Sequence, residues 1–463
     1  MLKVIFPLLL LSVALTTSAD AQRKPGDADA FQLREIHDRA MTQGQAYDWL
    51  LYLTQRIGGR LSGTPQAAAA VEYARQVMDT IGFDSVVLQP VMVPHWSRGE
   101  KEVVRVANSV AGSFDLNALA LGGSVGTGPG GIAAEIIEVN GLEAIDSLGE
   151  EVRGKIVFYN QPMDPTQLNA FAAYGSAVGQ RVYGATRAAK YGAIGALVRS
   201  MTNRQDDVPH TGSAVYLDEY PKTPAIAIST NDADRLSDLL KVGPVSVYIR
   251  TTSQMLPEKL SYNVIGEIRG SQYPEEILLV GGHLDSWDVG TGAHDDGAGV
   301  VHAMDAIYIL RKMGWKPQRT IRCVAFMNEE NGLRGAREYA RVSDERNEFH
   351  LAAIESDRGG FTPRGFSVQN TEGDFNKRFK KLLRFAELLE AYDLYFEIGG
   401  SGADIGPLKG QGGMLIGFLP DSQRYFDYHH TPTDNADAVS KRELQLGVAA
   451  IASLVYLIDT YGL

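Results

Sequence analysis

The stretch from His283 to Gly299 reads HLDSWDVGTGAHDDGAG and gathers imidazole and carboxylate side chains among glycines. It follows an apolar run at 277–280 that predicts a buried strand. It precedes residues 300–312, where apolar residues recur at helical spacing. The polar residues should therefore lie at the C-terminal end of a strand, which is where open α/β sheets bind ligands. We interpret this stretch as half of a metal site.

Four further polar clusters flank predicted strands. They are Glu329-Glu330 after a strand at 320–327, Glu355 to Asp357 after a strand at 351–354, Ser401 and Asp404 before a strand at 414–418, and YFDYHHTPTD at 425–434 after that strand. Each cluster has a structural explanation by itself, since Glu side chains stabilise a helix start and Asp side chains cap helices. Together, so many carboxylates would repel one another unless a cation held them, and the set predicts metal binding.

The chemistry that fits this set is hydrolysis assisted by two divalent metal ions. Such a pair needs a bridging carboxylate, terminal His and carboxylate ligands, and a water whose pKa the metals lower. The one cysteine, Cys323, lies in the apolar run RTIRCVAFMN and is expected to be an inert core thiol. Oxygen and imidazole ligands suit zinc, with manganese or cobalt as alternatives. A carboxylate outside the ligand set must move a proton to the leaving amine, and Glu329 and Glu330 can divide these roles.

The strands and helices that position these residues predict an α/β fold. From residue 255 to 463, strand and helix patterns alternate, which favours a mixed, largely parallel sheet covered by helices on both faces. Residues 22–116 carry helical patterns and a Val-rich strand at 84–93, and we expect them to form the first part of the same domain. The strands expected in the main domain are 263–268, 277–281, 320–327, 351–354 and 414–418, and the helices are 300–312, 333–340, 375–392 and 441–461.

Residues 117–254 differ from this pattern and indicate a β-rich domain inserted into the other. Short strand-like runs are expected at 133–139, 155–159, 193–198, 225–228 and 245–251, with helices at 182–190 and 232–241. The glycine-dense stretch at its start, LALGGSVGTGPGG, lacks the Gly-Lys-Ser/Thr ending of a phosphate loop and is interpreted as an entry loop. His210, the one histidine of this segment, is expected in a solvated loop.

The N-terminus and the charge restrict where the protein acts and what it binds. Residues 1–21 combine Lys3, a short apolar run and the small-x-small sequence Ala19-Asp20-Ala21, which predicts a cleaved signal peptide and a secreted or periplasmic protein. An N-terminal membrane anchor is the alternative. No other segment has the roughly 20 apolar residues of a spanning helix, so no membrane association is expected after cleavage. The net charge of −12 argues against a nucleic-acid surface.

The motifs HLDSWDVGTGAHDDGAG, NEENGLRG, ESD, GSGADIGPL and YHHTPTD, in this order, resemble peptidase family M28, the di-zinc aminopeptidases and carboxypeptidases. The resemblance covers essentially the whole mature chain. It implies a fold of the zinc-dependent exopeptidase type, and it makes the inserted segment similar to the protease-associated (PA) domain that many members carry. Any single motif would be weak, but the five together are highly specific.

The resemblance also implies a role for each matching residue. Two zinc ions would be bound by His283, Asp295, Glu330, Asp357 and His430, with Asp295 as the bridge, His283 and Asp357 on one zinc, and Glu330 and His430 on the other. Glu329 would be the general base, and the Asp285 carboxylate would hydrogen-bond the far ring nitrogen of His283. Ser401 and Asp404 would line the substrate pocket or stand behind the ligands. The neighbouring His429 and His294 match the family pattern less well.

These implications favour an exported di-zinc exopeptidase that acts on dipeptides or short peptides. A carboxylate-lined site attracts a free α-amino group, which favours recognition of the N-terminus over strict carboxypeptidase action. A one-zinc glutaminyl cyclase and a binding protein without catalysis are the less favoured alternatives, because the full ligand set and Glu329 are present. The resemblance also raises the expectation of a homodimer.

Overall fold

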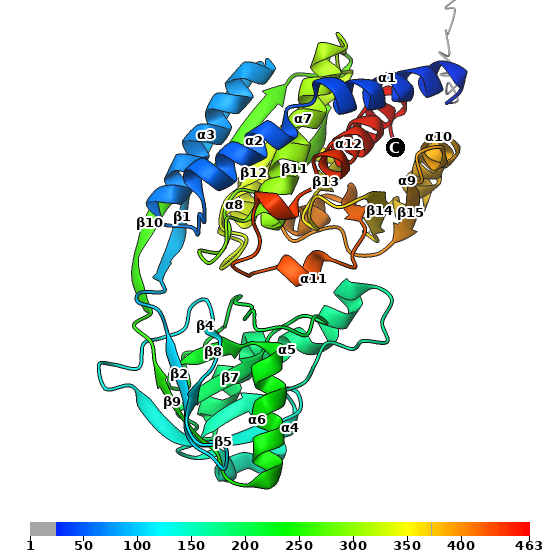
Figure 1. The fold of residues 1–463 in the computed structure, drawn as a ribbon. Helices are drawn as coiled ribbons and strands as arrows, with labels where there is room; N and C mark the ends of the chain where they lie inside the picture. Colours follow the sequence, from blue (N-terminus) through cyan, green and yellow to red (C-terminus); the bar gives the residue numbers. More distant parts are fainter. Residues whose placement is uncertain (1–24, 372) are drawn as a thin grey trace, which may run out of the picture.

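Two eight-stranded sheets make up the framework of this computed structural model, which describes residues 25–371 and 373–463 (Figure 1). The predicted signal peptide, 1–21, lies outside the described residues. Two long strands, β1 (Ser85–Ser97) and β10 (Gln254–Ile268), pair antiparallel along their whole length and run from one sheet toward the other. The chain therefore leaves the first sheet through β1 and returns to it through β10.

The first sheet has the order β1-β10-β12-β11-β13-β16-β14-β15. Its further strands are β11 (Tyr273–His283), β12 (Arg319–Phe326), β13 (Phe349–Glu355), β14 (Pro363–Gln369), β15 (Tyr395–Ile398) and β16 (Met414–Pro420). The central strands β12, β11, β13 and β16 are parallel, whereas β10 and β14 pair antiparallel to this group. Every residue of β12 is buried, as expected for a strand covered on both faces. The mixed α/β fold is confirmed.

Helices cover both faces of this sheet. One face packs against α1 (Asp27–Gln43), α2 (Ala46–Tyr52), α3 (Pro65–Ile81), α7 (Ala298–Lys312) and α12 (Lys441–Tyr461) in a single hydrophobic core. The other face packs against α8 (Arg334–Glu345) and the 3₁₀ turn Gly406–Gln411. Helix α12 is long and apolar enough to cross a membrane by length and composition, but most of it is buried against α7 and α1, so it serves as a core helix.

The remaining helical segments are short. A π-helical turn, Leu53–Ile57, follows α2, and α11 (Tyr425–Tyr428) follows β16. The helix expected at 375–392 is divided into α9 (Phe375–Leu382), a 3₁₀ turn at Leu383–Phe385 and α10 (Ala386–Glu390).

The second sheet has the order β3-β2-β9-β5-β6-β7-β8-β4. Its strands are β2 (Val103–Asn108), β3 (Phe114–Asp115), β4 (Ala118–Ala120), β5 (Ile132–Val139), β6 (Ile156–Tyr159), β7 (Gly195–Arg199), β8 (Ala225–Ile228) and β9 (Ser246–Arg250). Helices α4 (Ala144–Leu148), α5 (Ala170–Lys190) and α6 (Thr230–Val242) accompany it. The sheet already begins before residue 117, because β2 pairs with β9.

Helix α5 of the second sheet reaches the first domain. The Phe171 ring stacks on Tyr425 of α11 at 5.1 Å between centroids and meets Phe426 edge-on at 4.9 Å. Both of these α11 residues are buried in the same hydrophobic cluster as α5. Helix α5, which accompanies the second sheet, thus packs against the segment that follows β16.

Candidate metal centre

Three neighbouring parallel strands place the polar clusters at one edge of the first sheet. Strand β11 ends at His283, which pairs with Phe326 at the end of β12, and Gly281 pairs with Glu355 at the end of β13. Because the strands are parallel, the loops after them meet above the same edge. The Glu329-Glu330 pair lies on the loop after β12, and Asp357 lies two residues beyond β13.

Asp295 lies at the centre of the predicted ligands. Its Oδ1 is 3.2 Å from Nε2 of His283, and its Oδ2 is 3.1 Å from Nε2 of His430. On the His283 side, Nε2 is also 3.5 Å from Oδ1 of Asp357. On the His430 side, Nε2 is 3.1 Å from Oε2 of Glu330. The structure therefore brings all five predicted ligands together and places Asp295 between the two pairs.

The backbone fixes which nitrogen each histidine turns toward Asp295. The Nδ1 of His283 lies 3.0 Å from the carbonyl oxygen of Asp285, and the Nδ1 of His430 lies 3.3 Å from the carbonyl oxygen of Thr211. A carbonyl only accepts, so each Nδ1 must carry the proton when the ring is neutral. The lone pair of each Nε2 is then free for a metal ion.

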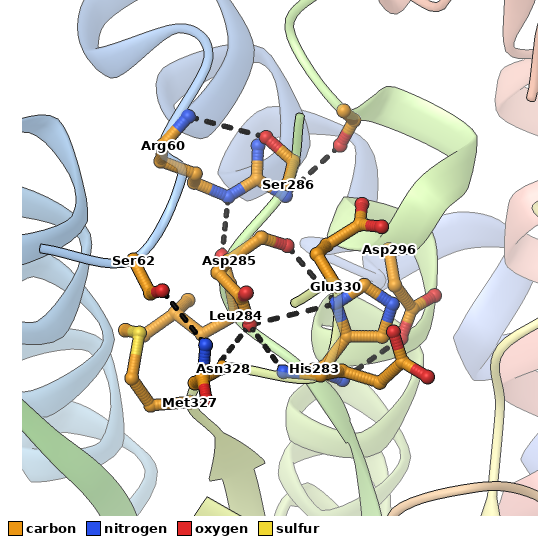
Figure 2. Close-up of polar contacts among 12 residues, drawn as sticks. Arg60, Ser62, His283, Leu284, Asp285, Ser286, Asp296, Met327, Asn328 and Glu330 are labelled. Carbon is orange, nitrogen blue, oxygen red and sulfur yellow. Dashed lines mark hydrogen bonds and ion pairs between the residues drawn. The ribbon is translucent and has the colours of Figure 1, made fainter. Parts of the chain in front are cut away.

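Asp285 differs from the expectation in how it acts on His283. Its carboxylate is 3.8 Å from Nδ1, too far for a hydrogen bond, and its backbone carbonyl takes that place. The carboxylate instead accepts hydrogen bonds from the backbone amides of Asn328, at 2.7 Å, and Glu329, at 3.1 Å (Figure 2). Asp285 thus holds the loop that carries the Glu pair.

The adjacent carboxylates of Asp295 and Asp296 have different partners. Oδ2 of Asp296 accepts from the backbone amide of His283 at 3.0 Å, and Oδ1 accepts from the amide of Gly299 at 2.9 Å. Asp296 therefore connects the end of β11 to the first turn of α7. Its two oxygens are occupied by the backbone, whereas Oδ2 of Asp295 has no hydrogen-bond donor.

Several buried ligand atoms lack partners and fit a cation. Oδ2 of Asp295, Oε1 of Glu330 and Oδ1 of Asp357 are buried without a hydrogen bond. Burial raises the pKa of Glu330 to about 7 and also raises the pKa of Asp357. Burial acts in the same direction on Asp295, but the facing imidazoles of His283 and His430 hold its pKa well below the usual range. Nitrogen and oxygen atoms of this cluster lie close enough together to bind metal ions, and this donor set suits zinc.

The cluster opens into a cavity of about 250 Å³. Residues of helix α5 and of the segments that follow β11, β12, β13 and β16 line it: Phe171, Tyr174, Arg181, Asp295, Glu329, Glu330, Asp357, Tyr425, Phe426, His429 and His430. Burial raises the pKa of Glu329 well above its usual range, and nearby carboxylates add to this effect. Glu329 therefore faces the same space as the ligands while none of the close contacts around Asp295 involves it.

The other predicted residues lie at different distances from the centre. The ring of His429 stacks on His430 at 3.5 Å, and its Nε2 is 3.7 Å from Asp295. His294 is engaged elsewhere, since its Nδ1 accepts from Gly360 and its ring stacks on Phe361. Ser401 donates to Gln369 at 2.7 Å and is not part of the cluster.

Asp404 is buried behind the centre, beside Glu355. Neither of its carboxylate oxygens has a hydrogen-bond partner, and burial, reinforced by the Glu355 charge, raises its pKa well above the usual range. The backbone amide of Ile405 donates to Glu355 at 2.8 Å. Asp404 thus lies behind the centre and makes no hydrogen bond with Asp295 or with the histidines.

The expectation for His210 is wrong. Its side chain is 1% exposed, and neither ring nitrogen has a partner. Burial lowers its pKa to about 3. The reason is tertiary: the amide of the next residue, Thr211, donates to the carbonyl of His430 at 3.0 Å. The loop that carries His210 and Thr211 therefore packs against the loop that carries His430, which covers it.

Two contributions have no recognisable signal in the sequence. The fully buried Arg60 donates to the carbonyls of Leu284, Thr291 and Gly292, which fixes the loop between His283 and Asp295 (Figure 2). From the second sheet, Ser213 donates its hydroxyl to the carbonyl of Glu330 at 2.7 Å. Neither residue belongs to a motif, and only the folded chain brings them to the site.

Comparisons with known proteins find relatives in sequence and in fold. The family model described as peptidase family M28 matches residues 263–455. Carboxypeptidase Q of Homo sapiens is 33% identical over 418 residues, which cover 90% of this chain and 85% of that protein. The structure of a peptidase M28 precursor from Shewanella amazonensis SB2B is similar with a TM-score of 0.88 at 32% identity, covering 94% of this chain and 97% of the other. A zinc aminopeptidase from Bacillus subtilis shares the fold, with a TM-score of 0.65 at 22% identity over 89% of this chain and 94% of the other.

Proposed function

Because the chain belongs to peptidase family M28 and is a metallopeptidase, we propose that it is a di-zinc exopeptidase that removes the N-terminal residue of dipeptides or short peptides. The position of Asp295 carries the proposal, since its two oxygens face His283 on one side and His430 on the other. A carboxylate with that placement can bridge two ions. The zinc aminopeptidase of the same fold supports the choice of metal.

The ligand set divides into two groups around this bridge. His283 and Asp357 would hold one zinc, and Glu330 and His430 would hold the other. Bound zinc supplies a water of lowered pKa and polarises the carbonyl of the scissile bond. Thr211 and the backbone of Asp285 keep the two imidazoles in the tautomer that ligation requires.

Glu329 is the proposed general base. Its carboxylate takes a proton from the attacking water and gives it to the leaving amine. Two observations support this role: Glu329 lines the cavity beside the ligands, and its raised pKa favours a carboxyl group that can hold the proton between the two steps. The hydrogen bond from its amide to Asp285 keeps the loop in place.

Charge favours a substrate with a free α-amino group. Asp295, Glu329, Glu330 and Asp357 all border the cavity. Bound cations neutralise part of this charge, and the remainder attracts an ammonium group. This supports aminopeptidase or dipeptidase action over strict carboxypeptidase action.

The remaining predictions complete the proposal. Export to the periplasm or the medium depends on residues 1–21, and N-terminal sequencing of the mature protein tests cleavage after Ala21. The second sheet is proposed to be a PA-like domain that closes the site, supported by the Ser213 contact to Glu330. The predicted homodimer is tested by light scattering on the purified protein.

The test of the activity is hydrolysis of dipeptides by the mature protein, with and without a chelator and added zinc. Each dipeptide is compared with its N-acetylated and C-amidated forms. We expect chelator-sensitive cleavage that is lost on N-acetylation. Cleavage that survives N-acetylation but not C-amidation would identify a strict carboxypeptidase. Two bound metal ions per chain are expected, whereas one would favour a cyclase and none a binding protein.

A further inference from the structure

Arg181 places a positive charge in the active-site cavity from the second sheet. It belongs to α5, and its side chain is 6% exposed. Of the described residues that line the cavity, it is the one arginine or lysine. A Cβ built on Gly212 would lie 2.5 Å from Nη1 of Arg181 and 2.8 Å from Nδ1 of His430, so the guanidinium lies beside the loop of this metal ligand.

This guanidinium lacks the partners that a buried charge needs. Its Nε and Nη1 atoms are buried without a hydrogen bond, and within residues 25–371 and 373–463 no carboxylate lies within 4.0 Å of it. The guanidinium carbon lies 5.5 Å from the centroid of the Tyr174 ring. A buried charge is costly unless it is paired, so the arrangement is complete only when an anion enters the cavity.

Some other buried arginines of the chain are paired with carboxylates. Arg322 pairs with Glu267 and Glu348, both at 2.7 Å. Arg319, which is also buried, pairs with Glu276 at 2.6 Å. Arg181 departs from this pattern, and it lines the cavity that also holds the proposed metal ligands.

We propose that Arg181 binds the C-terminal α-carboxylate of the substrate, which makes the enzyme a dipeptidase. The inference rests on the proposed function and names its substrate class. A carboxylate matches the planar guanidinium and can accept two parallel hydrogen bonds from it. The substrate's ammonium group then lies toward the acidic ligands and its carboxylate toward Arg181.

The charges also explain why the enzyme would select dipeptides over longer peptides. In a dipeptide the carboxylate is one residue beyond the scissile bond, and it can reach Arg181 within the same cavity that holds the metal ligands. In a longer peptide a neutral amide stands at that position and leaves the guanidinium unpaired. A site that leaves a buried polar group unpaired discriminates against that substrate.

The experiment measures kcat/KM for alanyl-alanine and for its C-terminal amide, using the full mature protein loaded with zinc. The selectivity is the ratio of the two values, which does not depend on the fraction of folded enzyme. We expect Arg181→Ala to lower this ratio by about 10- to 100-fold through loss of a charge-assisted contact. Arg181→Lys keeps the charge without the planar fork, so its ratio should fall between those of the wild type and Arg181→Ala.

Arg187→Ala is the matched control. Arg187 lies on the same helix, but it is only partly buried, does not line the cavity, and pairs with Asp146 and Glu143. The ratio of the two kcat/KM values should be the same in Arg187→Ala as in the wild type. An unchanged ratio in Arg181→Ala, including an equal loss on both substrates, overturns the proposal and assigns Arg181 to a group that both substrates share.

A binding measurement separates this inference from the proposed function. Calorimetric titration of Glu329→Gln with alanyl-alanine and its amide, with and without Arg181→Ala, needs no turnover. Tighter binding of the free acid that disappears in Arg181→Ala supports the carboxylate contact even if the wild type hydrolyses neither compound. Equal binding of the two compounds to Glu329→Gln overturns it even if dipeptides are hydrolysed.

Discussion

The carboxylate of Asp285 accepts a hydrogen bond from the backbone amide of Glu329 over 3.1 Å. The same oxygen, Oδ1, accepts from Asn328 at 2.7 Å. Asp285 lies just past the end of β11, and Glu329 lies on the loop after the neighbouring strand β12. One buried carboxylate therefore fixes the position of the loop that carries the proposed base.

Asp285→Ala should reduce both stability and activity. It leaves the buried amide of Asn328 without an acceptor, at a cost of about 1–3 kcal/mol, and also removes the acceptor of the partly buried Glu329 amide. Asp285→Asn keeps an acceptor oxygen and should lower stability and activity less than Asp285→Ala does. Thermal unfolding together with kcat for both variants checks this, and equal kcat values for Asp285→Ala and the wild type would contradict the positioning role.

Glu329→Gln should lower kcat by about 10²- to 10⁴-fold, because the amide cannot accept the proton from water. The zinc content should remain that of the wild type, since Glu329 is outside the proposed ligand set. Steady-state kinetics and metal analysis on the same preparation test both parts. Full activity would show that another group is the base.

Asp295→Ala should lower the number of zinc ions per chain, because the residue lies between both ligand pairs. Asp296→Asn is the matched comparison, since it changes the neighbouring carboxylate while an amide oxygen can still accept from the backbone. Metal analysis after dialysis provides the measurement. Two ions retained by Asp295→Ala would exclude Asp295 as the bridge.

Asp305, away from the metal centre, should make stability depend on pH. Its Oδ2 accepts from the amides of Gln45 and Ala46, both at 2.9 Å, and burial raises its pKa to about 7. The folded chain thus binds more protons than the unfolded chain between about pH 4 and 7. The stability that Asp305 contributes is full below this window and falls as pH rises through it, by at most about 1.4 kcal/mol per pH unit.

Asp305→Asn should remove this component. The melting temperature of Asp305→Asn relative to the wild type should therefore increase between pH 5 and pH 8. Asp238→Asn, at an exposed pair with Lys241, serves as the control and should run parallel to the wild type. If the melting temperature of Asp305→Asn also follows that of the wild type at every pH, the raised pKa of Asp305 is refuted.

The sequence predicted the elements that bury continuous or periodic apolar residues. β8 and α12 have the expected bounds, and β12 differs from them by one residue at each end. β14 and β15 were not predicted. β14 begins with a proline and contains Gly365, and β15 is largely exposed, so neither shows a strong apolar pattern.

The sequence by itself determined the family and the candidate ligands, because metal chemistry restricts residue types and spacings that remain visible along the chain. The tertiary structure decided their relation to one another: Asp295 between His283 and His430, the Asp285 carbonyl rather than its carboxylate on His283, and Arg181 in the cavity. The first two depend on distances between strand ends and loops. The third depends on α5 of the second sheet reaching the first, a contact across hundreds of residues that no local pattern records.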